Sequence, residues 1–462
     1  MDALENISPI DGRYRGYTEI LSRYFSEKAF MRYRIMAEGE YLITLSENFH
    51  IGLRRFTSAE KKRVRNLYEL TTKDANIIRD IERKGYGGIP ATNHDLKAIE
   101  YFLKLKLKNT SLRRATEWIH FGLTSEDATN LAYALMLSDA LANVVVPTLS
   151  RVEAALRALS RAHAGIPMLA RTHGQPASPT TFGKEMNFFR MRLNRQFGQL
   201  KQFRILAKLN GATGNYNALV AAYPKIDWIA FSKKFIGVFN KNRFIKLEPN
   251  LVTTQIEPHD TYAELFDILR RTNTILLGLN QDIWRYVSDG WLAQKSVKGE
   301  VGSSTMPHKI NPWFFENSEG NLGTANALFG FFSAKLPISR LQRDLSDSTS
   351  MRNFGTAFGH CLIGYEYLLK GLARVHVDRD VIGSALKHHP EVITEAIQTV
   401  LRREGVAMPY EKLKELTRGR EVTLLDLREF IETLPLRPTT KNELKKITPE
   451  NYIGLAKKLA RK

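Results

Sequence analysis

Residues 181–207 read TFGKEMNFFRMRLNRQFGQLKQFRILA. Apolar side chains recur in this stretch every three or four positions, at Phe182, Met186, Phe189, Leu193, Phe197, Leu200, Phe203 and Ala207. Such spacing places them on one face of a helix. At about 1.5 Å per residue the helix would be about 40 Å long. Because this exceeds the average helix of globular proteins, the stretch predicts a bundle of long helices.

Two further segments have the same character. Residues 261–289 repeat the apolar pattern, and Gly290 follows as a helix stop. A third segment runs from Glu126 to His163, where Pro147 is expected to bend or break the helix. Alternating patterns typical of strands are scarce, so the sequence predicts an all-α fold.

The chain has 462 residues, which is too many for one ordinary core. The segments 107–112 and 374–383 are the best candidates for boundaries. We therefore expect an N-terminal helical domain at 1–111, a central domain of long helices at 112–370 and a C-terminal helical domain at 371–462.

Composition excludes several classes of protein. No apolar run approaches the ~20 residues that a membrane span needs, and the N-terminus lacks the pattern of a secretory signal. The single Cys361 excludes an internal disulfide framework and a cysteine zinc cluster. A reducing cytoplasm is the expected location.

The formal net charge is +20, with a pI of about 9.8. This charge indicates either a polyanionic partner or a solvated basic surface. The basic residues are spread along the chain, and the sequence has no zinc-finger spacing, no basic region leading into heptads and no aromatic RNA-binding signature. Nucleic acid is therefore not the expected main partner.

Polar segments rich in glycine and proline separate the expected helices, at 8–14, 85–95, 122–127, 171–180, 210–217, 253–260 and 299–312. Their turn residues predict loops. Loops held by a rigid scaffold are where binding and catalytic residues concentrate.

These loops carry several candidates for chemistry, each with a plainer alternative. Ser303 is either a reactive serine or an ordinary loop serine, since no G-x-S-x-G motif surrounds it. His173 could donate a proton near neutral pH or simply bond to backbone. His94 stands beside Asn93 and Asp95, either of which could cap the following helix.

The segment GSSTMPHKINP at 302–312 resembles the signature loop of the fumarase/aspartase superfamily, whose members release fumarate or run a related reaction by β-elimination. Its MPHK form, with His308, is similar to the adenylosuccinate lyase branch or to the cycloisomerase branch. Other segments resemble the bacterial subgroup of adenylosuccinate lyases, in chain order: SPIDGRY, TNHDLKAIEY, FGLTSED, RTHGQPA, NGATGNYNA, TTQIEPHD, FENSEGNLG and QRDLSDSTSMRN.

The resemblance implies a three-domain, mainly helical subunit that assembles into a homotetramer with active sites shared between subunits. It implies two reactions of purine nucleotide biosynthesis. Adenylosuccinate would give AMP and fumarate, and the succinylocarboxamide ribotide SAICAR would give AICAR and fumarate. The resemblance implies no metal and no organic cofactor, and small-molecule substrates rather than a membrane or nucleic acid.

The resemblance also implies roles for individual residues. Ser303 would be the general base and His173 the general acid. The nucleotide phosphate or nearby groups would contact Arg13, Tyr14, Asn93, His94 and Asp95. The succinyl part or the base would contact Thr124, Ser125 and Gln255. A carboxylate would contact Ser304, Lys309 and Asn311, and the phosphate–ribose end would contact Arg343, Ser348 and Arg352.

Two alternatives remain open at this point. The chain could be another lyase or a cycloisomerase of the same superfamily, or a non-catalytic relative that binds anions. The presence of both Ser303 and His173 argues against the non-catalytic alternative.

Overall fold

The structure is a computed structural model that describes residues 3–48, 50–295, 305–306, 308–417, 419 and 421–462. Its residues divide into two compact units. The first comprises 1–149, 196–274 and 320–366, and the second comprises 150–195, 275–319 and 367–462. The three-domain division at residues 111 and 370 stays a prediction.

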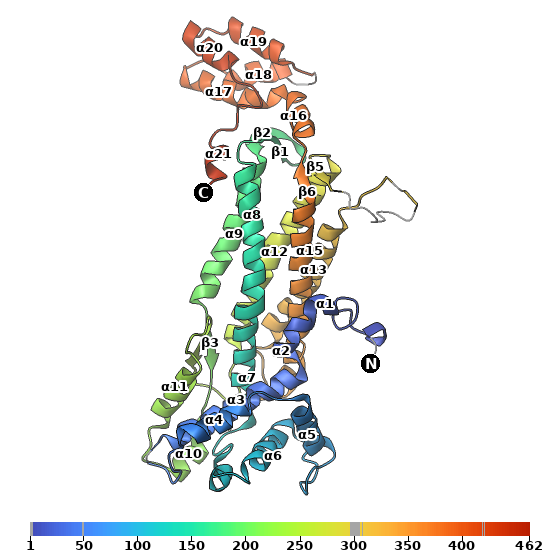
Figure 1. Cartoon of the computed structure of the whole chain (residues 1–462). Helices are drawn as coiled ribbons and strands as arrows, with labels where there is room; N and C mark the ends of the chain where they lie inside the picture. Colours follow the sequence, from blue (N-terminus) through green and yellow to red (C-terminus); the bar gives the residue numbers. More distant parts are fainter. Residues whose placement is uncertain (1–2, 49, 296–304, 307, 418, 420) are drawn as a thin grey trace. The chain divides into compact units, whose positions relative to one another are not determined.

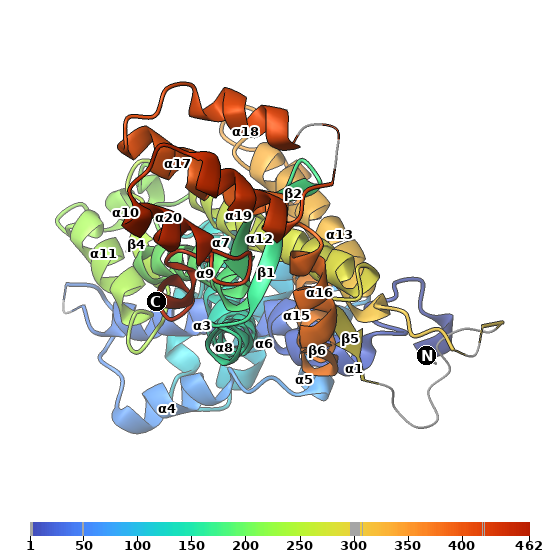
Figure 2. The same ribbon diagram turned by 90° about the horizontal axis from the view of Figure 1, so that it is seen from above.

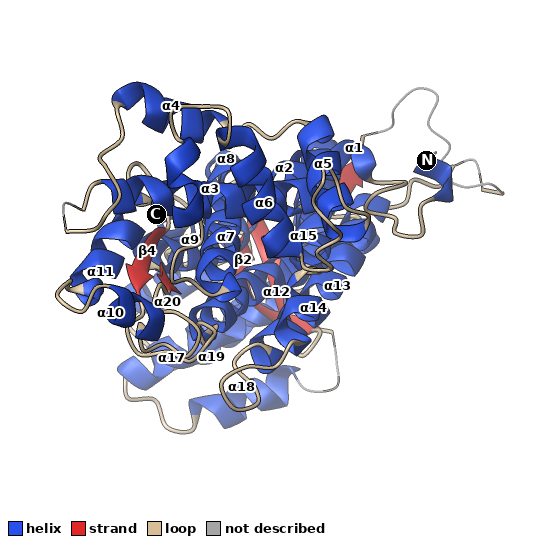
Figure 3. Cartoon of the chain, turned by 90° about the horizontal axis from the view of Figure 1, so that it is seen from below, coloured by secondary structure: helices blue, strands red, loops and turns tan. Residues whose placement is uncertain are grey.

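Helices dominate both units (Figure 3), as the sequence predicts. The helices that lie wholly or partly in the first unit are α1 (Arg15–Thr18), α2 (Ser22–Phe25), α3 (Glu27–Ser46), α4 (Ser58–Asn66), α5 (Thr72–Arg83), α6 (Asp95–Leu107), α7 (Ser125–Ala140), α8 (Val146–Ala162), α9 (Phe182–Gln202), α10 (Asn217–Ala222), α11 (Trp228–Val238), α12 (Asp260–Ser288), α13 (Trp313–Lys335), α14 (Ser346–Met351) and α15 (Phe354–Arg374). The remaining helices belong to the second unit: α16 (Arg379–Lys387), α17 (Thr394–Arg403), α18 (Pro409–Thr417), α19 (Leu424–Thr433), α20 (Pro438–Lys445) and α21 (Ala456–Leu459).

The strands of the described residues form three small two-stranded sheets. They are β1 (Pro167–Thr172) antiparallel to β2 (Gln175–Thr181), β3 (Arg204–Ala207) parallel to β4 (Lys246–Pro249), and β5 (Leu292–Gln294) antiparallel to β6 (Val375–Val377). None of these sheets forms a core of its own, because two strands bury too little apolar surface.

Helix α9 is shorter than the apolar pattern predicts. The pattern continues to Ala207, but the helix ends at Gln202 and residues 204–207 form β3. Ile205 and Ala207 are buried on alternate positions of this strand. An apolar residue at 207 therefore satisfies both a helical and an alternating pattern, and the sequence alone did not separate the two.

The sequence predicts that Pro147 bends or breaks the helix; a break is wrong, because residues 125–162 form one continuous helix, and a bend stays a prediction. Helices α7 and α8 follow one another through a π-helical turn at Leu141–Val145, which ends two residues before Pro147. Proline lacks an N–H, and its ring clashes with the carbonyl four residues earlier in a regular helix. The wider turn accommodates it. Residues 125–162 are long and apolar enough to cross a membrane, but most of this apolar stretch is buried, as in the core helix of a soluble protein.

Aromatic packing holds the core of the first unit. The ring of Phe266 on α12 lies 5.3 Å from that of Phe329 on α13 and 4.9 Å from that of Phe354 on α15. Phe30 on α3 packs against Tyr133 on α7, with 4.6 Å between ring centroids. These buried contacts hold α12, α13 and α15 together, and likewise α3 and α7, within the core of the first unit.

In the second unit, the C-terminal helices α17, α19 and α20 lie beside one another (Figure 2). The start of α9 approaches the end of α8 very closely. The N–H of Gly183 donates to the carbonyl of His163 at 3.1 Å, and a Cβ at residue 183 would lie 2.7 Å from Cα of Ala164. Only glycine permits this approach, which fixes the base of the β1–β2 hairpin.

Candidate active site

A pocket of about 510 Å³ lies in the first unit, among α3, α5, the N-termini of α6 and α7, and the segment around α14. Predicted substrate contacts from three distant parts of the sequence line it: Asn93, His94, Asp95, Ser125, Arg343, Ser348 and Arg352. The structure therefore brings these residues together in one place.

The N-terminus of α6 presents three of them. The Nδ1 atom of His94 accepts a hydrogen bond from the backbone N–H of Lys97 at 3.1 Å, so His94 itself is the helix cap. The prediction that Asn93 or Asp95 caps this helix is wrong. Asn93 precedes the cap in the left-handed region, at φ 48°, which asparagine tolerates. Oδ1 of Asp95 accepts a hydrogen bond from the backbone N–H of Leu96 at 2.8 Å, and Oδ2 faces side-chain partners.

Asp95 binds two arginines. Its Oδ2 lies 2.7 Å from Nη1 of Arg34 and 3.2 Å from Nη2 of Arg352. Arg352 also pairs with Glu27, at 2.8 Å. Burial opposes the charged form of Asp95, but the two guanidinium groups outweigh it and hold the pKa of Asp95 below its ordinary value. The carboxylate therefore fixes both arginines against the pocket.

The N-terminus of α7 is anchored by a buried ion pair. The backbone N–H of Thr124 donates to Oδ2 of Asp127 at 2.9 Å. Oδ1 of Asp127 accepts from Nζ of Lys208 at 2.7 Å and from the backbone N–H of Asn210 at 3.0 Å, and both charged side chains are fully buried. The turn at 208–211 and the start of α7 are thus held together, which fixes Thr124 and Ser125.

A row of side-chain contacts links three of the predicted residues and ends at Glu126, which the sequence did not single out. Nε2 of Gln255 donates to Oγ1 of Thr124 at 3.5 Å, and Nη1 of Arg343 donates to Oε1 of Gln255 at 3.4 Å. Nη2 of Arg343 lies 2.9 Å from Oε1 of Glu126. Glu126 is buried, and burial raises its pKa although Arg343 opposes this.

A second pocket of about 380 Å³ shares His94 and Ser125 with the first, and Thr124 and His120 line it as well. His120 adopts the left-handed conformation, at φ 61°, and its Nδ1 lies 2.6 Å from Oε1 of the buried Glu38. Burial favours the neutral ring, but Glu38 outweighs this and raises the pKa of His120. Sequence reasoning missed His120, because only the folded chain shows its carboxylate partner.

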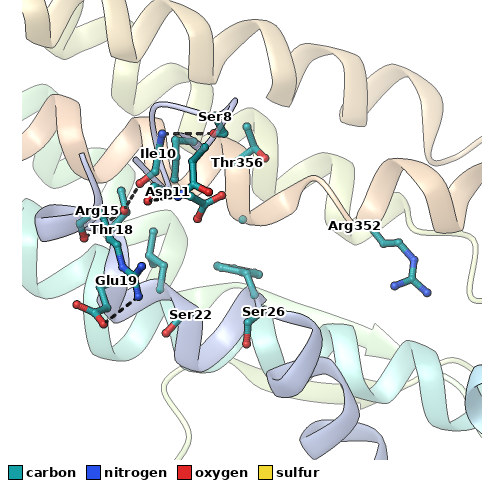
Figure 4. A pocket seen from close by; sticks show the side chains of 14 residues that line it. Ser8, Ile10, Asp11, Arg15, Thr18, Glu19, Ser22, Ser26, Arg352 and Thr356 are labelled. Atoms are coloured by element: carbon teal, nitrogen blue, oxygen red, sulfur yellow. Dashed lines mark hydrogen bonds and ion pairs between the residues drawn. The ribbon is translucent and has the colours of Figure 1, made fainter. Parts of the chain in front are cut away.

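Residues of the N-terminal segment line a third pocket, of about 440 Å³ (Figure 4). Oγ1 of Thr18 donates to the carbonyl of Ile10 at 2.7 Å and ties this segment to α1. Arg352 lines both this pocket and the first. Arg13 and Tyr14 directly precede α1 and do not line the first pocket, so their predicted contact with phosphate stays a prediction.

His173 lies in the second unit, at the tip of the β1–β2 hairpin. Residues 171–180 were predicted as a loop, but Thr172 pairs with Gln175 and only His173 and Gly174 form the turn. Their φ angles are 53° and 75°, the signature of a type I′ turn. Nη1 of Arg171 donates to the carbonyl of Gly174 at 3.3 Å. The side chain of His173 is exposed at the tip of the hairpin.

The other predicted residues of the second unit precede α13. The side chain of Lys309 is exposed and that of Asn311 is half-buried. The backbone N–H of Lys309 donates to the carbonyl of Met306 at 3.1 Å. Ser303 and Ser304 lie outside the described residues, so their roles stay predictions.

The chain closely matches known proteins. The family model for lyases matches residues 12–326, and the model described as "Adenylosuccinate lyase C-terminal" matches residues 339–453. Adenylosuccinate lyase of Vibrio cholerae is 46% identical over 100% of this chain and 99% of its own length. The chain belongs to the adenylosuccinate lyase family. A further adenylosuccinate lyase, from Escherichia coli K12, is 45% identical over 99% of this chain and 98% of its own length, and that of Dictyostelium discoideum is 46% identical over 98% and 97%.

Solved structures share the fold. A fumarate lyase from Mesorhizobium sp. BNC1 superposes with a TM-score of 0.72 at 18% identity, over 96% of both chains. The 3-carboxy-cis,cis-muconate lactonizing enzyme of Pseudomonas putida gives 0.71 at 19%, over 97% of both chains. These likenesses confirm the mainly helical fumarase/aspartase fold, and the family models and relatives confirm the resemblance to adenylosuccinate lyases.

Proposed function

We propose that this protein catalyses the β-elimination of fumarate from adenylosuccinate, giving AMP, and from SAICAR, giving AICAR. Identity of about 45% to adenylosuccinate lyases over essentially the whole chain is the observation that carries this proposal. The arginines that line the pocket of the first unit support it, because both substrates are strongly anionic.

The charge of the pocket suits such a ligand. Each substrate has two carboxylates and a phosphate, about four negative charges in all near neutral pH. Five arginines and four carboxylates line the pocket. Guanidinium groups bind phosphate and carboxylate through paired hydrogen bonds, which fixes orientation as well as charge.

The proposed reaction needs one base and one acid. Ser303, as its alkoxide, removes a proton from the succinyl carbon next to a carboxylate and becomes a neutral hydroxyl. The resulting carbanion is delocalised into that carboxylate. The bond between the other succinyl carbon and nitrogen then breaks, its electrons stay with nitrogen, and the carbanion's pair becomes the double bond of fumarate. His173 protonates the departing nitrogen. Lys309 stabilises the carboxylate while it gains charge.

We also propose that the family's oligomeric nature takes the form of a homotetramer with shared sites. Large apolar side chains stand exposed on the long helices, among them Phe188 and Met191 on α9 and Trp284 on α12. Exposed apolar residues on one stretch of helix suit burial against further copies of the chain.

A cycloisomerase is the second candidate within the superfamily. The lactonizing enzyme shares the fold at only 19% identity, which supports the architecture and not that activity. A non-catalytic relative that binds anions is the remaining alternative.

The test is to incubate the purified protein separately with adenylosuccinate, with SAICAR and with 3-carboxy-cis,cis-muconate, and to separate the products by chromatography. We expect AMP from the first, AICAR from the second, and fumarate from both. Lactone formation from the muconate without AMP or AICAR would establish the cycloisomerase. Binding of AMP without turnover of any substrate would establish the non-catalytic alternative.

A further inference from the structure

We propose that Arg79 and Arg83 of α5 form an additional phosphate contact in the pocket of the first unit. The inference rests on the proposed function, because it assigns the phosphate of the nucleotide substrates to this side of the pocket. Neither arginine was singled out by sequence reasoning.

The geometry of α5 directs both side chains to the pocket. Helix α5 packs beside α6 (Figure 1) and buries Ile78 and Ile81, which are 1% and 0% exposed. Arg79 and Arg83 are four residues apart, so they project from one face, one above the other. Both line the pocket together with His94, and both are exposed to solvent.

The ion pairs distinguish these two arginines from the others in the pocket. Arg34 is paired with Asp95, and Arg352 with Asp95 and Glu27. Arg343 is paired with Glu126 in the same way. A paired guanidinium has fewer donors and less net charge to offer an incoming anion.

Arg79 and Arg83 form no ion pair with any residue that the structure describes. Glu82, between them in sequence, also lines the pocket but pairs with neither. The two arginines are therefore the cations lining this pocket that have no ion-pair partner among the described residues. A phosphate dianion gains most from such cations, because two guanidinium groups one helical turn apart can share its oxygens.

The arrangement also separates the two ends of the substrate. His94 and Ser125 line both the first and the second pocket, whereas Thr124 lines only the second. The succinyl part or the base is expected near Thr124. The phosphate is then left for the α5 side, where Arg79 and Arg83 lie.

The test compares AMP with adenosine, which differ only by the phosphate. Calorimetry on the full chain measures the affinity of each for the wild type and for the double variant Arg79→Gln/Arg83→Gln. We expect the wild type to bind AMP more tightly than adenosine. The double variant should lose AMP affinity by about tenfold or more, the scale of a lost charge-assisted contact, with adenosine affinity unchanged. Unchanged adenosine affinity also shows that the pocket is intact.

Lys62→Gln/Arg63→Gln is the matched control. Lys62 and Arg63 are exposed residues of α4 that do not line the pocket, and their loss lowers the net charge by the same two units. An equal fall in AMP affinity in this variant would mean that only overall charge matters and would overturn the proposal. The proposal would also be overturned if the AMP affinity of the Arg79→Gln/Arg83→Gln double variant were within twofold of that of the wild type. The same holds if the wild type bound neither AMP nor adenosine.

Turnover separates this proposal from the proposed function. If the wild type releases fumarate and the double variant binds AMP normally, the phosphate contact is wrong and the function stands. If the wild type releases no fumarate but AMP binding falls in the double variant, the function is wrong and the anion contact stands.

Discussion

At the residue scale, a row of contacts in the candidate site begins at Glu126. Its carboxylate holds Arg343, which in turn contacts Gln255 and, through it, Thr124. Three predicted substrate contacts thus depend on a side chain that has no predicted contact of its own.

Glu126→Gln should weaken substrate binding. The amide has nearly the same shape but no charge, so Arg343 loses the partner that fixes its direction. We expect KM for adenylosuccinate to rise about tenfold, with a smaller fall in kcat. Steady-state kinetics of this variant, of Arg343→Gln and of the double variant form a double-mutant cycle. Additive effects of the two substitutions would contradict a role of Glu126 through Arg343.

The buried pair of Lys208 and Asp127 makes a prediction about stability. Lys208→Met leaves the Asp127 carboxylate buried without its cation, which should lower the free energy of unfolding by about 3–5 kcal/mol. The double variant Lys208→Met/Asp127→Leu should be less destabilised than Lys208→Met, because no charge then remains buried. Urea unfolding measures the free energy of unfolding of both variants. A double variant that is less stable than Lys208→Met would show that hydrogen bonds of Asp127 to the backbone matter more than its charge.

The sequence could predict many residues of the pocket but not their partners. Asn93, His94, Asp95 and Ser125 stand in short motifs that resemble a known family. Glu126 stands in one of the same motifs, yet its role depends on Arg343, more than two hundred positions later. Such roles follow from contacts between distant segments, which no local pattern contains.

At the element scale, the β1–β2 hairpin positions His173 by backbone conformation. Gly174 adopts φ 75°, and a Cβ there would meet no atom within 4 Å. Any effect of a side chain at this position is therefore an effect of backbone strain.

Gly174→Ala should lower kcat more than it raises KM, because the strained turn displaces the proposed general acid. It should also lower the free energy of unfolding by about 1 kcal/mol. Gly198→Ala on α9 is the control, since its site is equally open and helical, and there alanine should stabilise by up to about 1 kcal/mol. Steady-state kinetics measure kcat and KM of both variants, and thermal unfolding measures their stability. Equal kcat in Gly174→Ala and the wild type would mean that the turn does not set the position of His173.

Helices with a single clear apolar repeat could be predicted from the sequence, whereas segments whose residues fit more than one pattern could not. Helix α12 ends at Ser288, shortly before the predicted stop at Gly290. The hairpin was missed because its strands are short and hold two prolines besides the first residue of β1, at positions that read as a loop. The helix does not break at Pro147 because a π-helical turn, which has no sequence signature of its own, precedes the proline.

At the scale of the whole molecule, the proposed shared site predicts complementation between inactive variants. If His173 and Ser303 of different chains serve one site, His173→Ala and Ser303→Ala should rescue each other in mixed tetramers. Random reassortment would give roughly a quarter of sites both intact residues. The two variants are denatured, mixed, refolded and assayed for fumarate release.

Each variant refolded alone is the control for this experiment. Native mass spectrometry shows whether the mixture contains hybrid tetramers. Activity no higher than the controls in a mixture with hybrids would contradict sites shared between chains.

The most direct measurement is proton NMR of adenylosuccinate during incubation with the wild type and with Ser303→Ala. The account predicts that the wild type converts it to one fumarate per AMP, because the elimination consumes no second reactant. Ser303→Ala should be slower by about 10²–10⁴-fold, the usual cost of a lost general base. Intact adenylosuccinate after prolonged incubation with folded wild-type protein that binds AMP would contradict the account.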